Sequence, residues 1–377
     1  MKKEKINKII LKTGALTMLT MLFLLVSCKV GRYFIYNFAD LKDHEIFHNR
    51  PLTKSSRPFQ FIPTNSNHAP KKIKDKKGEF QDFENYLEEN KTVALMVIRN
   101  DSILYENYFK GYSQTDIVPS FSMAKSVLSI LIGCAIEDGL INSVHDTVTT
   151  YIPEFNERGF DDVTIEHLLQ MTSGLKFNEG YFNPFGKVAT FYYGTRLRNA
   201  TERLKTNRSA GEKFEYLSGN SQILGHILDK VLGDKTITEY LQEKIWTPIG
   251  MEYDASWSID RKNNGIEKTF CCINARAKDF AKIGRLFLNK GNWNGEQLVP
   301  EKWVDKSTQV DEKNGSAWYY QYQWWLPSKK GDFMAIGILG QYIYVNPNKN
   351  LIIVRLGKKE GDINWWKLLL YLAEDFY

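Results

Sequence analysis

Residues 127–136 of this 377-residue chain constrain its fold more than any other segment, because they are apolar almost all round a helix. The run reads VLSILIGCAI and leaves no broad polar face to turn toward water. A helix of this kind is stable only when other elements surround it. We therefore expect residues 127–136 to form a buried central helix, with Cys134 in the core. A hydrophobic content of 43% is ample for such a core.

A serine and a lysine stand three residues apart just before this run. Ser122 and Lys125 would lie on the same face of a helix that continues into the apolar segment. A serine hydroxyl is a poor nucleophile at neutral pH and needs a neighbouring base, and a partly desolvated amine with a lowered pKa can be that base. At the start of a helix the serine would also gain from the helix dipole and the free N–H groups. The value of this pair depends on partners further along the chain.

Strand patterns occur near both ends of the chain, with helical patterns between them. A hairpin is predicted at residues 92–98 and 103–109, and later strands at residues 319–326, 333–338, 341–345 and 351–356. Helices are predicted from near residue 79 and at residues 221–232, 279–288 and 365–372. This order favours an α+β fold: one antiparallel sheet built from both ends of the chain and flanked by helices, plus an all-helical region inserted at about residues 141–294.

The N-terminus reads as an export signal that ends at a lipidation site. Five lysines precede an apolar run at residues 15–26, which is short for a bilayer span. The run ends in LVSC, similar to a bacterial lipobox. Residues 1–27 are thus expected to be a signal peptide, and Cys28 the lipid-anchored first residue of an exported, cell-envelope protein. An uncleaved anchor or an ordinary signal peptide is the alternative. Residues 28–78 are expected to form a tether with short ordered pieces, and residues 79–377 the folded domain.

Charge and cysteine content exclude two further classes. The first 27 residues contribute five lysines and one glutamate to the net charge of +6, so the remainder carries only +2. That balance argues against a nucleic-acid-binding surface. Cys271 and Cys272 are adjacent, and disulfide geometry disfavours a bond between neighbours, so no disulfide framework is expected. No pattern specifies an oligomeric state.

A competing motif lies close to the lipidation site. Residues 44–48 read HEIFH, which fits the zinc-metalloprotease signature His-Glu-x-x-His. On a helix both imidazoles would share one face, with Glu45 as general base and His68 as a third ligand by spacing. The surrounding segment has little capacity to form a packed zinc domain, so we interpret it as a surface or docking segment. No metal and no organic cofactor is expected.

A phenol follows in the middle of the chain, where residues 216–220 read YLSGN. Tyr216 could relay protons between a serine–lysine pair and a leaving group, provided that a nearby cation lowers its pKa. The same segment supplies a hydroxyl at Ser218 and an amide at Asn220. Tyr216 alone carries little weight, because the chain has 20 tyrosines.

Five motifs in order make the chain resemble the beta-lactamase-related serine hydrolase family, which includes class C beta-lactamases, penicillin-binding-protein-like enzymes and esterases. The 6-aminohexanoate-dimer-hydrolase-like branch is the most similar. The motifs are SMAK at 122–125, LLQMTSGL at 168–175, YLSGN at 216–220, NARAKDFAKIGR at 274–285 and GILGQ at 337–341. The resemblance runs from about residue 80 to the C-terminus and implies the serine beta-lactamase-like fold.

The resemblance also implies a role for each matching residue. Ser122 matches the acylated nucleophile of the family, Lys125 the lysine that activates it, and Tyr216 the tyrosine that shuttles protons to the leaving group and from water. Gly337 matches the glycine of the family's Lys-Thr-Gly strand motif. Ile338 then stands where a backbone N–H, with that of Ser122, would form the oxyanion hole.

Two departures from the family pattern bear on the substrate. Ala335 and Ile336 replace the Lys and Thr that help to hold a substrate carboxylate in beta-lactam and D-alanyl peptide enzymes, which disfavours efficient beta-lactam hydrolysis. Ser218 stands where the family pattern has an asparagine, and Asn220 follows two residues later. Either of these two could orient Lys125.

We interpret the chain as an exported, lipid-anchored serine hydrolase that cleaves ester or small amide substrates through an acyl-enzyme on Ser122. The first alternative is a beta-lactamase or D-alanyl peptidase-like cell-wall enzyme, which Ala335 and Ile336 disfavour. The second is a catalytically silent envelope-binding protein, which the intact serine and lysine disfavour. The acyl and leaving groups are not specified, because loops shape the pocket.

Overall fold

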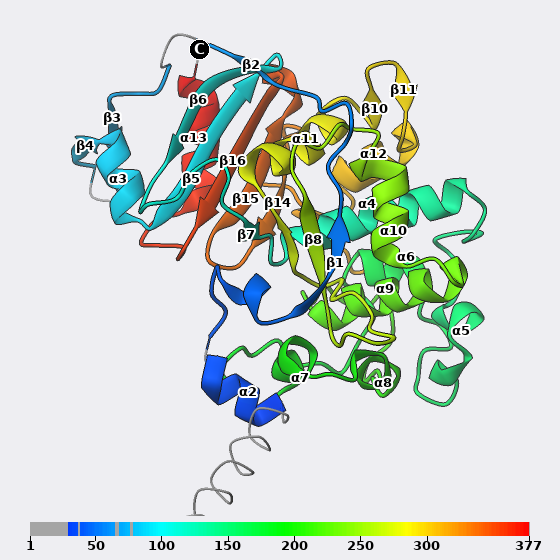
Figure 1. Cartoon of the computed structure of the whole chain (residues 1–377). Coiled ribbons are helices and arrows are strands. Elements are labelled where there is room, and N and C mark those ends of the chain that lie inside the picture. Colours follow the sequence, from blue (N-terminus) through cyan, green and yellow to red (C-terminus); the bar gives the residue numbers. More distant parts are fainter. Residues whose placement is uncertain (1–28, 37, 65–67, 76–77, 377) are drawn as a thin grey trace, which may run out of the picture.

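The computed structural model describes residues 29–36, 38–64, 68–75 and 78–376, and an eight-stranded sheet dominates it (Figure 1). Neighbouring strands of this sheet are antiparallel, except that β2 runs parallel to β6. In spatial order they are β12 (Tyr320–Gln321), β13 (Trp324–Trp325), β14 (Phe333–Gly337), β15 (Gln341–Asn346), β16 (Leu351–Gly357), β5 (Thr92–Arg99), β6 (Ser102–Tyr108) and β2 (Ile62–Pro63). The prediction of one sheet built from both ends of the chain is confirmed.

Both faces of this sheet are covered, and the alternation along β5 shows how. Leu95 and Val97 pack in one apolar cluster with α13 and α3, while Met96 and Ile98 belong to the main core, which includes α11. Successive side chains of a strand point to opposite faces, so one fully buried strand supplies both layers. The helices are α3 (Phe83–Glu89), α11 (Ala277–Leu288) and α13 (Trp365–Asp375).

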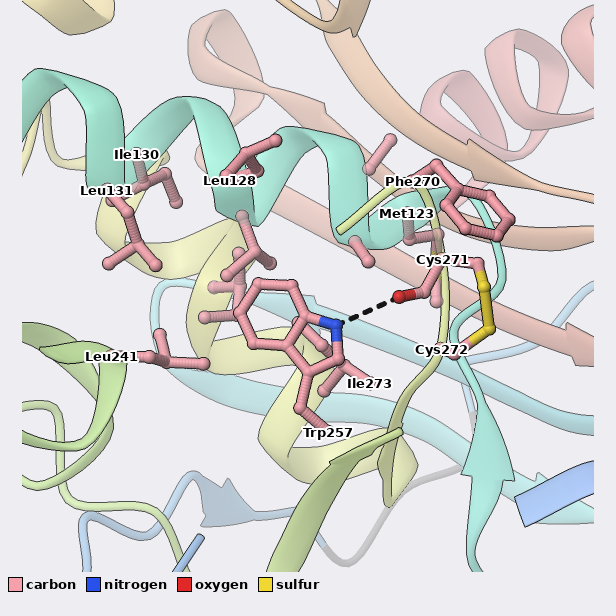
Figure 2. Packing of buried hydrophobic residues seen from close by; sticks show 14 of the residues in the cluster. Met123, Leu128, Ile130, Leu131, Leu241, Trp257, Phe270, Cys271, Cys272 and Ile273 are labelled. Atoms are coloured by element: carbon pink, nitrogen blue, oxygen red, sulfur yellow. Dashed lines mark hydrogen bonds between the residues drawn. A yellow bond between two sulfur atoms is a disulfide. The ribbon is translucent and has the colours of Figure 1, made fainter. Parts of the chain in front are cut away.

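Helix α4 (Met123–Glu137) is the central helix that the apolar run predicts. Every side chain from its first residue to Ala135 is buried. It packs between the sheet and α9 (Ser218–Leu232), and its core neighbours include Trp257 and Leu241 (Figure 2). Because the helix is buried, it holds Ser122, the residue immediately before it, in a fixed position.

The region predicted to be a helical insertion contains seven helices but also two strands of a second sheet. This second sheet has four antiparallel strands in the spatial order β1 (His48–Leu52), β8 (Ala255–Ile259), β9 (Ile273–Ala275) and β7 (Val118–Pro119). Of these, β8 and β9 lie in the predicted insertion. Helix α11 lies inside the predicted insertion, yet it covers the large sheet. The other helices here are α5 (Val148–Tyr151), α6 (Ile165–Leu169), α7 (Lys187–Tyr193), α8 (Leu197–Glu202), α9 and α10 (Ile237–Leu241), followed by the π-helical turn η3 (Gln242–Trp246).

The N-terminal segment, predicted to be a tether, contacts the body of the protein along much of its described length. Strand β1 pairs with β8 over five residues, and β2 pairs with β6. The sequence of β1, HNRPL, does not predict a strand, because apolar and polar residues do not alternate in it. The other pieces are α2 (Lys29–Tyr36), η1 (Asp43–Glu45) and β3 (Lys72–Lys74), which pairs with β4 (Phe80–Asp82) at the start of the predicted domain.

The remaining elements complete the periphery. The single strand expected at residues 319–326 is instead the tight hairpin β12–β13, since Tyr322 and Gln323 adopt positive φ values of 40° and 68°.

None of the described helices is both long and apolar enough to cross a membrane. The other elements are η2 (Pro153–Phe155), β10 (Asn292–Trp293), β11 (Glu296–Gln297), α12 (Glu301–Thr308) and η4 (Pro347–Lys349).

Candidate active site

Ser122 occupies the N-cap position of α4, at the end of a tightly held turn. The N–H of Ser120 donates to the carbonyl of Ile273 over 2.7 Å, and the N–H of Ile273 donates to Ser120 Oγ over 3.0 Å. Phe121 then adopts a left-handed conformation, with φ of 44°, although it is buried and not a glycine. Such a backbone persists only where its surroundings fix it. The turn thereby holds Ser122 at a defined position on the edge of a cavity.

Lys125 lies directly beside the serine. Its Nζ donates to Ser122 Oγ over 2.8 Å and to the carbonyl oxygen of Phe270 over 2.8 Å, and the side chain is only 1% exposed. Burial lowers the pKa of Lys125 to about 8, while the negative charge of Glu179 opposes that effect. A substantial fraction of the amine is therefore neutral near pH 8 and able to accept a proton.

Tyr216 completes a cluster of three, but its pKa does not move as the sequence predicts. Its ring centroid lies 5.0 Å from Lys125 Nζ, and the Ser122 side chain lies close enough to lower the pKa of its hydroxyl against the effect of burial. Desolvation raises the pKa of Tyr216 above its usual value, and the Glu179 carboxylate raises it further. The expectation that a cation lowers this pKa is wrong, because desolvation by burial is the largest influence on it. Tyr216 is a neutral phenol that can both donate and accept.

Ser218 and Asn220 both make hydrogen bonds away from the lysine. Ser218 N–H donates to Glu179 Oε2 over 2.7 Å, and its hydroxyl donates to Oε1 of the same carboxylate. Asn220 accepts from the hydroxyl of Ser173 and donates to Met171 Sδ over 3.3 Å. Neither residue therefore orients Lys125. The backbone carbonyl of Phe270 does so instead.

Glu179 is the site residue that the sequence did not suggest. It belongs to the loop before α7, where no periodic pattern marks it, and it reaches Ser218 across 39 residues of chain. The hydroxyl of Tyr181 also donates to its carboxylate, over 3.2 Å. Its charge acts on both Lys125 and Tyr216. Glu179 is therefore the acidic group that tunes this cluster.

Gly337 and Ile338 lie across from the serine, at the end of β14. A Cβ on Gly337 would stand 2.3 Å from the carbonyl oxygen of Ser120, so the strand end touches the turn that carries Ser122. Ile338 lines the same cavity as Ser122. The two segments are thus close enough to face one bound carbonyl group from two sides.

The cavity beside Ser122 has a volume of about 250 Å³ and an almost wholly apolar wall. None of the described residues that line it carries a formal charge. Tyr33, Phe38 and Ala39 of the N-terminal segment form part of the wall, together with Phe270 and Cys271. Such a cavity favours a small apolar acyl group over an ion.

The adjacent cysteines form a disulfide beside this cavity (Figure 2). The prediction that Cys271 and Cys272 do not bond to each other is wrong. Cys272 adopts a φ of 79°, so the bond lies in a turn with a left-handed residue. A general preference against neighbouring bridges could not anticipate that turn.

The other sequence candidates lie elsewhere. Cys28 falls outside the described residues. The histidines of residues 44–48 do not share one helix, because His44 lies in η1 and His48 begins β1. In the described part of the chain, no group of three or more His, Cys, Asp or Glu side chains is arranged to hold a metal ion.

Comparisons with known proteins bear on the family and the fold of this chain. The beta-lactamase family model matches residues 81–364. The 6-aminohexanoate-dimer hydrolase of Paenarthrobacter ureafaciens is 29% identical over 307 residues, which cover 76% of this chain and 77% of that protein. A Bacillus anthracis structure provisionally described as a 6-aminohexanoate-dimer hydrolase superposes with a TM-score of 0.78 at 24% identity, over 89% of this chain and 92% of the other. A family VIII carboxylesterase gives a TM-score of 0.60 at 17% identity, over 78% and 94% of the two chains.

Proposed function

This chain belongs to the beta-lactamase family of hydrolases, and we propose that it cleaves ester or small amide bonds of neutral substrates through an acyl-enzyme on Ser122. One observation carries the proposal: a buried lysine with a lowered pKa lies 2.8 Å from the Ser122 hydroxyl. A serine next to such an amine has the base that it needs to attack a carbonyl.

The proposed reaction runs in two halves. In the first, Ser122 Oγ attacks the substrate carbonyl while neutral Lys125 takes its proton. Tyr216 gives its proton to the leaving group, which departs, and Lys125 reprotonates Tyr216. In the second, a water attacks the acyl-enzyme ester, its proton passes through these groups to Ser122 Oγ, and the carboxylic acid is released. We assign the oxyanion hole to the backbone N–H groups of Ser122 and Ile338, where two donors can contribute several kcal/mol.

The uncharged cavity wall supports a neutral substrate. A beta-lactam or a D-alanyl peptide brings a carboxylate, and burying it without a cation is costly. The chain has Ala335, which is buried in the core, where a lysine would be needed. A cell-wall peptidase or beta-lactamase is therefore the second candidate, and nitrocefin turnover would favour it.

The test is hydrolysis of a short-chain p-nitrophenyl ester, with nitrocefin measured in parallel. We expect ester turnover by the wild type, and its loss in Ser122→Ala and in Lys125→Ala. Ser129→Ala is the matched control: Ser129 is a buried serine of α4 whose hydroxyl has no partner in the described part of the chain. Mass spectrometry should find the acyl group on Ser122. Full turnover by Ser122→Ala would refute the mechanism, and a folded but inactive wild type would favour the silent binding protein.

We further propose that the protein is exported and anchored through Cys28. The apolar run at residues 15–26 and the LVSC sequence support this. Helix α2 follows directly after Cys28, and Phe34 is 69% exposed on it, as expected for a helix next to a lipid surface. Labelling with a fatty-acid analogue during bacterial expression should mark the wild type but not Cys28→Ser. Equal labelling of both proteins would refute the anchor.

A further inference from the structure

The carbonyl oxygen of Phe270 determines where the Lys125 amine sits. A lysine side chain has a flexible four-carbon stem, so its head group is placed by its acceptors. In the described residues the acceptors of Lys125 are Ser122 Oγ and the Phe270 carbonyl, each at 2.8 Å. Only the second is independent of the reacting atom. Any movement of the turn that carries Phe270 would therefore change the distance between the base and the nucleophile.

That turn is fixed from behind by Trp257 of β8. The indole Nε1–H donates to the carbonyl of Cys271 over 2.9 Å (Figure 2). It also donates to the carbonyl of Lys268, over 3.1 Å. The N–H of Cys271 also donates to the Lys268 carbonyl, over 2.9 Å, and the Cys272 carbonyl accepts from Ser258 over 2.9 Å. Trp257 is fully buried. The backbone on the far side of Phe270 is thus anchored to a rigid core.

The disulfide is a further constraint on this turn. Cys271 and Cys272 follow Phe270 directly, and their bond closes a small ring around the intervening peptide. Cys272 is held at a φ of 79°, a conformation that costs a non-glycine residue about 1–2 kcal/mol. Cys271 also lines the cavity beside Ser122, so the ring lies between the substrate space and the core.

We propose that the Cys271–Cys272 disulfide is a positioning element of the active site, which fixes the turn so that the Phe270 carbonyl holds Lys125 against Ser122. The inference rests on the proposed hydrolase function. Reduction adds two electrons and two protons and yields two thiols, while a phosphine reductant is oxidised to its oxide. The freed turn would then let water reach Lys125 and loosen its contact with the serine.

The experiment compares ester hydrolysis by the folded enzyme before and after reduction with a water-soluble phosphine. It uses a Cys134→Ser background, because Cys134 is the buried free cysteine of α4. Iodoacetamide labelling and mass spectrometry report how much of the disulfide is open. We expect kcat to fall at least about tenfold, with a smaller change in KM, since small misplacements of a reacting group are costly.

The pH profile separates positioning from a general loss of structure. Three groups face the Lys125 amine: the hydroxyl of Ser122, the ring of Tyr216 and, through its charge, Glu179. Water entering this cluster reduces the desolvation of Lys125, so the acidic limb of kcat against pH should move to higher pH. Reoxidation should restore both kcat and the limb. Cys271→Ala/Cys272→Ala should match the reduced enzyme.

The outcomes are distinguishable from failure of the proposed function. An inactive untreated enzyme would refute the hydrolase itself. An active enzyme whose kcat and pH limb are unchanged by complete reduction would overturn the positioning role alone. A loss of activity that tracks loss of helical circular dichroism and does not recover on reoxidation would also overturn it, in favour of a purely structural bond.

Discussion

Gly337 approaches Ser120 so closely that a Cβ on the glycine would stand 2.3 Å from the serine carbonyl oxygen. It would also lie 3.2 Å from Cβ of Phe121. The end of β14 is thus pressed against the turn that presents Ser122, and the proposed oxyanion donors belong to these two segments. Glycine in a strand often marks such a close backbone approach.

Gly337→Ala should therefore lower kcat for ester hydrolysis about a hundredfold, because the added methyl group must push the two segments apart. It should also cost about 1–3 kcal/mol of stability, as overpacking does. Gly284→Ala on α11 is the matched control. Its Cβ would meet methyl groups of Ile343 and Ile352 at 2.9 and 3.0 Å, far from the serine turn. It should lower Tm but not kcat, and equal kcat losses in both variants would contradict the argument.

Turnover should rise with pH and reach half of its maximum near pH 8. Lys125 must be neutral to accept the proton of Ser122, and burial lowers the pKa of Lys125 to about 8. Tyr216 adds no second ionisation in this range, because desolvation raises its pKa above 10. The measurement is kcat/KM for a neutral ester from pH 5.5 to 9.5. A profile that is flat below pH 7 would show that the amine is not the base.

The same lysine should make the protein less stable as pH falls. The unfolded state binds the proton near pH 10.5 and the folded state only near 8, so stability is lost between these values and stays lost below 8. The interval corresponds to about 3 kcal/mol. Lys125→Met removes the titration. Measured by urea titration, its unfolding free energy relative to the wild type should be higher at pH 7 than at pH 10.5. A difference that does not change with pH would contradict the buried charge.

The sequence predicts well those features that depend on neighbouring residues in the chain. The apolar run at residues 127–136 predicts a buried helix, and helical spacing alone brings Ser122 and Lys125 onto one face. The short apolar runs at β5 and the later strands, separated by turn residues, predict the large sheet. In each case the signal lies within a few consecutive residues.

The features that it missed depend on contacts between distant segments. The acceptor that holds Lys125 is a backbone carbonyl 145 residues away, and a carbonyl has no side-chain signature. Glu179 reaches Ser218 from a loop without any periodic pattern. The rise in the pKa of Tyr216 reflects burial, which the YLSGN motif does not encode. The sequence of β1 lacks apolar alternation, and the strand forms because its backbone pairs with that of β8.

Tyr216→Phe should reduce kcat about a hundredfold, because it removes the hydroxyl that we propose to relay protons beside Ser122. Tyr320→Phe is a close control. The Tyr320 ring lies 5.7 Å from that of Tyr216, and its buried hydroxyl has no hydrogen-bond partner among the residues that the structure describes. Its removal should leave kcat unchanged and slightly raise Tm. Equal losses of kcat in both variants would argue for packing of the aromatic cluster rather than for proton transfer.

Glu179→Gln should move the acidic limb of turnover to lower pH. The Glu179 carboxylate favours the charged form of Lys125 and so raises its pKa, against the larger effect of burial. An amide keeps an acceptor for Ser218 but removes the charge, so the lysine should lose its proton at lower pH. Glu215→Gln is the control, because Glu215 precedes Tyr216 but pairs with Arg208 and Lys213 and does not contribute to the pKa of Lys125. The measurement is kcat/KM against pH for the three proteins. The limb should shift only in Glu179→Gln, and an unshifted limb in that variant would mean that its charge is screened from the amine.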